Sequence, residues 1–331
     1  MRVGFGQFST TASGPSHDYL AFAKQYGATD VLLNTAELPG DGGRWQLKDL
    51  VKLRVAVEQH DLRLAALENV PVHFYDQIML GGPQREQQLE NMIFTIRNIA
   101  RAGIPVFGYH WMPSHVWRTP PKHIRGGAVA TAFDERIARE LPLTHDREYT
   151  EEEMWANLEE WITIITPIAE EEGVRLGIHP CDPPVERLGG IPQLLRSFAA
   201  YKRLIEIYPS PSNAIEFCQG TFAEMDEDIY EMIRYFGERD KILYVHFRNV
   251  SGPVPTFHEE FINTGYVDMA RAMRIYHEVG FDGFFIDDHV PQTIHDTAWG
   301  HRGRAFANGY IQGLIDSLTS AERTEGGAPR P

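Results

Sequence analysis

Residues 150–179 read TEEEMWANLEEWITIITPIAEEEGVRLGIH, a pattern typical of one helix followed by one strand. Thr150 precedes a run of glutamates, which is the arrangement of a helix N-cap with acidic residues in the first turn. Apolar side chains then recur at helical spacing, at Trp155, Leu158, Trp161, Ile162, Ile165 and Ile168. The run 174–179 is short and largely apolar, so we expect a buried strand there.

The same alternation of strand and helix recurs along the chain. Short β-branched or aromatic runs that end in polar residues lie at 3–8, 30–34, 63–70, 105–111, 174–179, 213–218, 242–249 and 284–289. Helical patterns lie at about 17–26, 47–60, 84–102, 150–172, 191–207, 222–236, 267–279 and 304–319. Eight strand–helix units that are joined by right-handed crossovers close into a barrel. The pattern predicts an α/β chain with a single (β/α)8 TIM-barrel domain over residues 1–320 and a disordered tail at 321–331.

An open, doubly wound sheet is the rival architecture, and it requires a glycine-rich phosphate loop after its first strand. Gly4 and Gly6 fall inside the first strand, and no third glycine follows at the required spacing. The segment 112–148 is rich in proline, glycine and arginine. We expect it to be a long loop after the fourth strand that covers the active site.

The composition limits which binding partners and which cellular compartment we expect for the protein. A formal net charge of −15 argues against nucleic acid, because phosphate binding needs a basic face. The two cysteines, Cys181 and Cys218, form no CxxC pair, which favours a reducing, cytoplasmic compartment. The chain shows no signal-peptide pattern and no run of about 18 apolar residues, so we expect no membrane association. A small-molecule substrate is expected, and the choice between a monomer and a homo-oligomer stays open.

The predicted strand ends carry an unusual set of polar side chains. Active sites of TIM barrels lie at the C-terminal ends of the strands. Consecutive strands there supply His179, Cys218 and His246, and the next supplies Asp288. Neighbouring strands lie about 5 Å apart, so these side chains can converge on one point. Imidazole, thiolate and carboxylate together bind a borderline divalent ion, and the coincidence predicts a metal site.

The segment 177–184, GIHPCDPP, resembles the HPDDPP signature of the mannonate dehydratases, which convert D-mannonate to 2-keto-3-deoxy-D-gluconate. Other segments similar to that family follow in order between about residues 60 and 314, at 69–73, 111–113, 117–119, 149–153, 167–171, 218–221, 245–249, 256–259, 267–269 and 288–289. The resemblance implies a barrel that binds Mn²⁺, Fe²⁺ or another divalent metal. It also implies that the ligands are His179, Cys218, His246 and Asp288, the set that the strand ends indicate.

The chain departs from the family pattern in three places. Cys181 replaces an aspartate of the signature, and we expect it to be a packing residue. The loop after the fourth strand is shorter than in the enterobacterial enzymes. In the altered last loop, residues 304–306 (Arg-Ala-Phe) stand where the family carries Gly-Tyr-Ser. His301 and Arg302 are the candidates to replace the missing tyrosine, and we expect them to contact the substrate.

Dehydration of a sugar acid needs a group that moves protons and a group that holds the carboxylate. His289 is the first candidate acid or base, and its alternative role is to orient Asp288. Arg248 is the candidate carboxylate clamp, and its alternative role is a structural ion pair.

Further candidates complete the predicted site. We expect His110 and His258 to reach substrate hydroxyls or the leaving group. His73 and Trp111 are expected to bind the substrate. We also expect Glu68 to lie in the barrel mouth. Glu259 and Asn263 are expected to form hydrogen bonds within their loop.

Three alternatives stay open from the sequence. A dehydratase of another aldonic acid fits the same residues. A sugar isomerase or epimerase of the xylose-isomerase-like group would share the barrel, although such enzymes usually present more carboxylate ligands. A barrel that binds a sugar acid without turnover is the third, and ligand-induced thermal stabilisation without product would identify it.

Overall fold

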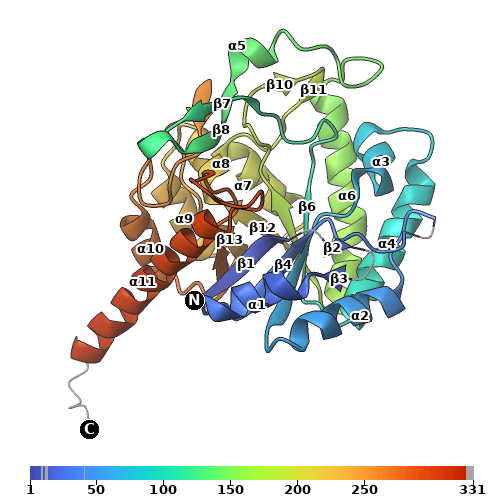
Figure 1. The fold of residues 1–331 in the computed structure, drawn as a ribbon. Helices are drawn as coiled ribbons and strands as arrows, with labels where there is room; N and C mark the ends of the chain where they lie inside the picture. Colours follow the sequence, from blue (N-terminus) through green and yellow to red (C-terminus); the bar gives the residue numbers. More distant parts are fainter. Residues whose placement is uncertain (9, 12–13, 41, 326–331) are drawn as a thin grey trace.

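The computed structural model describes residues 1–8, 10–11, 14–40 and 42–325. Its central feature is a closed barrel of parallel strands in the order β1-β15-β13-β12-β9-β6-β5-β4 (Figure 1). These strands are β1 (Arg2–Phe8), β4 (Asp30–Asn34), β5 (Arg63–Glu68), β6 (Val106–His110), β9 (Arg175–His179), β12 (Asn213–Cys218), β13 (Ile242–His246) and β15 (Phe284–Ile286). The predicted TIM barrel is confirmed.

A layer of helices surrounds the barrel (Figure 1). The helices are α1 (His17–Gln25), α2 (Leu47–Glu58), α3 (Asp76–Leu80), α4 (Arg85–Arg101), α6 (Glu151–Glu172), α7 (Phe198–Ile207), α8 (Gln219–Glu224), α9 (Ile229–Gly237), α10 (Met269–Glu278) and α11 (His301–Glu325), with short turns at η1 (Val72–Phe74) and η2 (Arg125–Gly127). The expected N-cap of α6 is confirmed, since the Thr150 hydroxyl accepts the Glu153 N–H at 3.1 Å. The helix ends at Gly173, whose φ of 75° lies in the left-handed region that favours glycine.

The segment predicted as a long loop, 112–148, is more ordered than expected. It contains β7 (Thr119–His123), β8 (Val129–Asp134) and α5 (Glu135–Ala138). Strand β14 (Thr256–His258) joins them in an antiparallel sheet of order β14-β8-β7. The rings of Phe133 and Phe257 are buried and pack with centroids 5.8 Å apart, which explains why these distant segments pair.

Other boundaries also differ from the predictions. The hairpin β10 (Arg187–Leu188) and β11 (Ile191–Pro192) occupies the start of the predicted helix 191–207, and α7 begins only after Ser197 caps it. The predicted helix 222–236 is split into α8 and α9. The last helix runs to Glu325, so the first five residues of the predicted tail are helical, and 326–331 lie outside the described residues. A short pair, β2 (Thr10–Thr11) and β3 (Gly14–Pro15), follows β1.

The barrel interior is packed with side chains. A small apolar cluster fills it, with Leu32, Ala65, Ala66, Ala214, Leu243, Tyr244, Phe284 and Ile286. Gly108 of β6 faces this interior, where a Cβ would lie 2.1 Å from the Tyr244 hydroxyl and 3.0 Å from Glu216 Oε2. Glycine is therefore required at 108. Among the described helices, none combines the length and apolar character needed to cross a bilayer.

Candidate metal centre

The four side chains selected from the strand ends lie together in the structure. His179, Cys218 and His246 end β9, β12 and β13, and one ligand atom from each lies within 4.8 Å of the others. Asp288 follows β15, and its Oδ2 lies 3.8 Å from Cys218 Sγ and 3.5 Å from His246 Nδ1. All four are buried. Parallel register explains the convergence, because Cys218 pairs with His246 across neighbouring strands.

Hydrogen bonds orient both imidazoles toward this cluster. His179 Nδ1 lies 2.7 Å from the Pro180 carbonyl, to which it donates its proton, so Nε2 carries the lone pair. His246 Nε2 lies 2.8 Å from Glu68 Oε2 and donates to it, which leaves the lone pair on Nδ1. This Nδ1 is buried and has no hydrogen-bond partner within the described part of the chain. A buried nitrogen without a partner is a group that a cation can satisfy.

The electrostatic setting favours the anionic forms of the other two groups. Burial alone would raise the pKa of Cys218, but Arg248 and His179 lower it well below its usual value. Burial also opposes ionisation of Asp288, but His289 and His246 hold its pKa well below the usual range. Burial lowers the pKa of His179, but Glu216 and Cys218 raise it to about 10, so a cation that binds Nε2 would displace a proton from this nitrogen. A thiolate, a carboxylate and two imidazole nitrogens therefore fit a divalent cation.

Arg248 lies beside the cluster, and each nitrogen of its guanidinium contacts a side chain of the site. Nε lies 3.1 Å from Asp288 Oδ2 and 3.3 Å from Cys218 Sγ. Nη2 donates to Asp182 Oδ2 and to the Thr221 hydroxyl, each at 2.7 Å. Nη1 contacts Glu259 and Glu224. The guanidinium is buried among protein carboxylates, so the contacts favour the structural ion pair over the expected clamp.

This network also contains Arg118, Asp182 and Glu224, for which no role was predicted. Arg118 comes from the segment before β7 and binds Asp182 with two hydrogen bonds, of 2.6 and 2.9 Å. It also donates to Glu259 Oε1 at 3.2 Å, so Glu259 does more than hydrogen-bond within its loop. Burial and the nearby Asp182 raise the pKa of Glu224 well above its usual value, although Arg248 opposes this shift. The sequence signal for Arg118 and Asp182 was their place in two family-like segments.

Arg304 is a further residue that the sequence did not single out for a role. It extends from the first turn of α11 and donates to Asp287 Oδ1 at 3.1 Å and to the Asp288 carbonyl at 2.9 Å. Asp288 has a φ of 56°, in the left-handed region that is unfavourable for most residues. Arg304 therefore holds the backbone that presents the candidate ligand Asp288.

Two predicted catalytic histidines lie next to the cluster. His289 is the more open of them, with its side chain 34% exposed, and its Nε2 lies 3.6 Å from Asp288 Oδ1. Its Nδ1 lies 3.4 Å from Glu259 Oε1. His110 is buried in register with His179, and its Nδ1 accepts the Met112 N–H at 3.2 Å. Burial and His179 lower the pKa of His110 to about 3, so it is neutral with its remaining proton on Nε2.

The other predicted substrate contacts lie apart from the four ligands. Trp111 is fully buried against Trp161 of α6, with ring centroids 6.1 Å apart, so its expected substrate contact stays a prediction without support from the geometry. His258 pairs with Glu260 and not with the cluster. His73 is exposed on η1.

The two residues proposed to replace the family tyrosine also point elsewhere. His301 packs against aromatic rings of α1, 4.9 Å from Phe22 and 5.6 Å from Tyr19. Arg302 is exposed and donates to the Ile294 carbonyl at 3.0 Å. Neither contacts the cluster in the structure, so their expected substrate contacts stay predictions without support from the geometry.

Cys181 and Asn263 lie where expected. Cys181 is buried in the core, and burial raises the pKa of its thiol to about 12, which suits a packing residue. The side chain of Asn263 lies 3.4 Å from Arg125 in a surface hydrogen bond.

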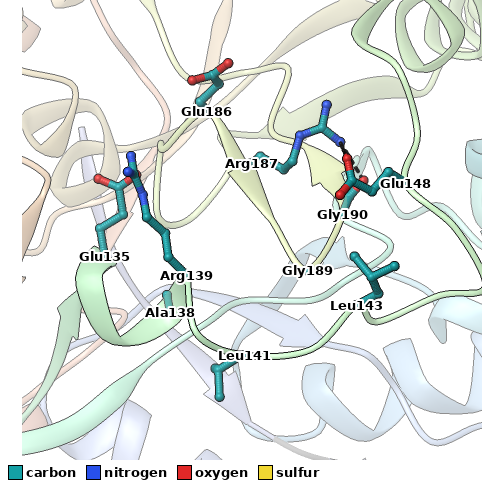
Figure 2. A pocket seen from close by; sticks show the side chains of 10 residues that line it. All are labelled: Glu135, Ala138, Arg139, Leu141, Leu143, Glu148, Glu186, Arg187, Gly189 and Gly190. Atoms are coloured by element: carbon teal, nitrogen blue, oxygen red, sulfur yellow. Dashed lines mark hydrogen bonds and ion pairs between the residues drawn. The ribbon is translucent and has the colours of Figure 1, made fainter.

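A separate pocket of about 380 Å³ lies between α5 and the β10–β11 hairpin. Figure 2 shows Arg139 beside Glu135 on one side of it and Arg187 beside Glu148 on the other. Its lining is Glu135, Ala138, Arg139, Leu141, Leu143, Glu148, Glu186, Arg187, Gly189 and Gly190. None of the predicted site residues is among them, so this pocket is not the candidate centre.

A comparison with known protein families extends over most of the chain. The family model described as D-mannonate dehydratase (UxuA) matches residues 14–145 and 135–325. The chain belongs to the D-mannonate dehydratase family. Mannonate dehydratase 2 of Halalkalibacterium halodurans is 29% identical over 345 residues, covering 93% of this chain and 98% of the relative. The mannonate dehydratase of Streptococcus uberis is 31% identical over 314 residues, covering 85% and 89% respectively.

Solved structures agree with this family membership. The crystal structure of mannonate dehydratase from Streptococcus suis serotype 2 has a TM-score of 0.86 and 29% identity, covering 100% of this chain and 96% of that chain. The structure of L-ribulose 3-epimerase has a TM-score of 0.62 at 15% identity and shows the shared fold alone. The relatives of the D-mannonate dehydratase family are named as dehydratases, which are hydro-lyases, so the predicted lyase is confirmed.

Proposed function

We propose that this chain removes water from D-mannonate to give 2-keto-3-deoxy-D-gluconate, with one divalent cation, Mn²⁺ or Fe²⁺, held by His179, Cys218, His246 and Asp288. The observation that carries the proposal is the convergence of these buried groups, with one ring nitrogen of each imidazole hydrogen-bonded to the protein and the other facing the cluster. Family membership supports the class of reaction.

The reaction breaks the C2–H bond and the C3–O bond of the sugar acid. The proton from C2 passes to a base, and the C3 hydroxyl leaves as water after an acid protonates it. The enol that results gains a proton at C3 and loses the proton of its C2 hydroxyl, which gives the 2-keto-3-deoxy acid. A bound divalent cation would neutralise the negative charge that develops on the substrate carboxylate as the proton leaves.

His289 is our candidate for the proton transfer, because it is the most open titratable group beside Asp288. His110 is neutral and can donate its Nε2 proton to a substrate oxygen. We assign Arg248 a positioning role: it keeps Asp288 and Cys218 charged and in place, and it does not touch the substrate.

The ligand assignment is tested by replacing one ligand at a time. His179→Ala and Asp288→Ala should each lose bound Mn²⁺, measured by elemental analysis, and should form no 2-keto-3-deoxy acid from mannonate. His17→Ala, at an exposed histidine of α1, is the matched control and should retain both. Full metal content in both ligand variants would discard the assignment.

A dehydratase of another aldonic acid is the second candidate, and the altered last loop favours it. Arg304 turns inward to Asp287 and the Asp288 carbonyl, Ala305 has no functional group, and Phe306 packs near Phe261. A panel of aldonic and uronic acids, with neutral ketoses included, should be assayed for 2-keto-3-deoxy acids. Highest turnover on an acid other than mannonate would select this candidate, and conversion of a ketose alone would select an isomerase.

A further inference from the structure

A buried pair of carboxylates lies beside His246 Nε2, whereas the other ring nitrogen, Nδ1, faces Asp288. Glu68 ends β5 and Glu216 lies in β12, and both are almost completely buried. Glu68 Oε2 lies 2.8 Å from His246 Nε2, and Glu216 Oε1 lies 3.0 Å from the same nitrogen. The deep end of the candidate metal centre therefore rests on two acidic groups around one imidazole N–H.

The two carboxylates differ in how they meet this N–H. The contact with Glu68 is a hydrogen bond, whereas neither oxygen of Glu216 has a hydrogen-bond partner among the described residues. The other oxygen of Glu68 accepts a hydrogen bond from the Asn34 amide at 2.6 Å. Glu68 is thus held at both oxygens by one donor each, and one of these donors is His246.

We propose that Glu68 is the positioning residue that fixes the tautomer of His246, so that the lone pair of Nδ1 points at the cation. This inference rests on the proposed metal centre. An imidazole that gives its proton to a carboxylate on one nitrogen is a stronger ligand through the other, and its ring is held in place. Asn34 completes the chain by orienting Glu68.

The packing around the pair supports a fixed arrangement. Gly108 leaves room for the Tyr244 hydroxyl and for Glu216 Oε2, both of which would clash with a Cβ. Glu216 also lies 3.8 Å from His179 Nε2, so it faces both ligand rings without accepting a hydrogen bond from either. Its contribution is therefore electrostatic, while the contribution of Glu68 is directional.

Glu68→Gln is the informative substitution. The glutamine side chain has a single acceptor oxygen, whereas the Asn34 amide and the His246 N–H each need an acceptor. Either the Asn34 amide or the His246 N–H then loses its acceptor. We expect the affinity for Co²⁺, measured by chelator competition, to fall roughly 10- to 100-fold. The visible absorption bands of the Co²⁺-loaded protein should also change. Glu216→Gln should lose less affinity, because the hydrogen bond from His246 to Glu68 is kept.

Asp30→Asn is the matched control, since Asp30 is a buried carboxylate at the opposite end of the barrel, paired with Arg2 and Arg63. It should alter thermal unfolding without altering the Co²⁺ spectrum. Unchanged Co²⁺ affinity and spectrum in Glu68→Gln, or a larger loss in Glu216→Gln, would overturn the proposal.

The stoichiometry of the wild-type protein separates the remaining outcomes. One equivalent of Co²⁺ per chain is expected. Two equivalents would overturn the inference, since a second cation between Glu68, Glu216 and His246 would take the place of the N–H. A wild-type protein that binds no Co²⁺ would refute the proposed centre itself, which is a different result from the failure of Glu68→Gln alone.

Discussion

Replacing Arg304 with methionine removes the guanidinium that holds the loop carrying Asp288. Arg304 is buried, and it donates to Asp287 Oδ1 at 3.1 Å, to the Asp288 carbonyl at 2.9 Å and to the Trp299 carbonyl at 2.8 Å. Its guanidinium carbon lies 4.7 Å from the centroid of the Trp299 ring. Methionine keeps an apolar stem over that ring and supplies no donor.

The size of the effect follows from what Arg304→Met leaves behind. Removing one partner of a buried ion pair costs about 3–5 kcal/mol, because the other charge stays buried without compensation. Two carbonyl acceptors also lose charge-assisted hydrogen bonds worth about 1.5–3 kcal/mol each, although water and loop movement recover part of this. We expect the free energy of unfolding to fall by roughly 4 kcal/mol.

The pH dependence of this loss has a defined sign. Burial raises the pKa of Asp287 and Arg304 lowers it, with a net increase above its usual value. Without Arg304 the pKa rises further, so the folded protein holds this proton more tightly than the unfolded chain does. The contribution of Asp287 to the free energy of unfolding is then most favourable at pH values below the ordinary aspartate pKa, and it is lost as the pH rises through the folded-state pKa. Urea unfolding should show a smaller deficit for Arg304→Met at pH 5 than at pH 8.

A second substitution separates charge from geometry. Adding Asp287→Asn to Arg304→Met neutralises the unpaired carboxylate and should recover roughly half of the lost stability. The Asp288 backbone still lacks its anchor, so the affinity for Mn²⁺ should stay reduced, roughly tenfold. Wild-type stability in Arg304→Met, or a further loss on adding Asp287→Asn, would refute the reasoning.

Three more substitutions or treatments test the site. His289→Asn should keep full metal content and lose roughly 100-fold or more in turnover, and unchanged turnover would remove His289 from the reaction. Gly108→Ala should destabilise the barrel by about 1–3 kcal/mol by calorimetry, with partial recovery in the double variant with Tyr244→Phe, because its Cβ would meet the Tyr244 hydroxyl; no recovery would argue against that clash. Chelation should lower the unfolding temperature, Mn²⁺ should restore it, and Mn²⁺ affinity should fall as pH is lowered because the ligands must lose protons; a temperature insensitive to both treatments would contradict a bound cation.

Local rules explain which parts of the fold could be predicted. The cap at Thr150 and the apolar spacing of α6 depend on residues a few positions apart, and both were predicted. Cys218 and His246 converge because they are register partners on neighbouring parallel strands, and His179 ends the next strand beside them. The β14-β8-β7 sheet was missed because its pairing joins Asp134 to Thr256, which no local pattern indicates.

The candidate site, too, could be predicted only in part from the sequence. Strand ends indicate which side chains reach the barrel mouth, but not which guanidinium meets which carboxylate. Arg248 binds Asp182 and Glu259, and Arg118 reaches the same two groups from another loop. The strand pattern also did not indicate that Trp111, which follows the end of β6, packs its ring against Trp161 of α6.

The small sheet of β7, β8 and β14 limits how this enzyme can be re-engineered. Two loops that lie far apart in sequence are joined by the backbone hydrogen bonds of this sheet, so one loop cannot be exchanged without affecting the other. A chimaera that imports the segment 112–148 from a relative would set a foreign strand against this chain's own Thr256–His258, and it would lose the packing of Phe133 on Phe257 unless the relative carries the same pair. Such hybrids should be less stable, whereas exchange of both segments together preserves the packing. Recombination between relatives is then expected to inherit these distant stretches as one unit.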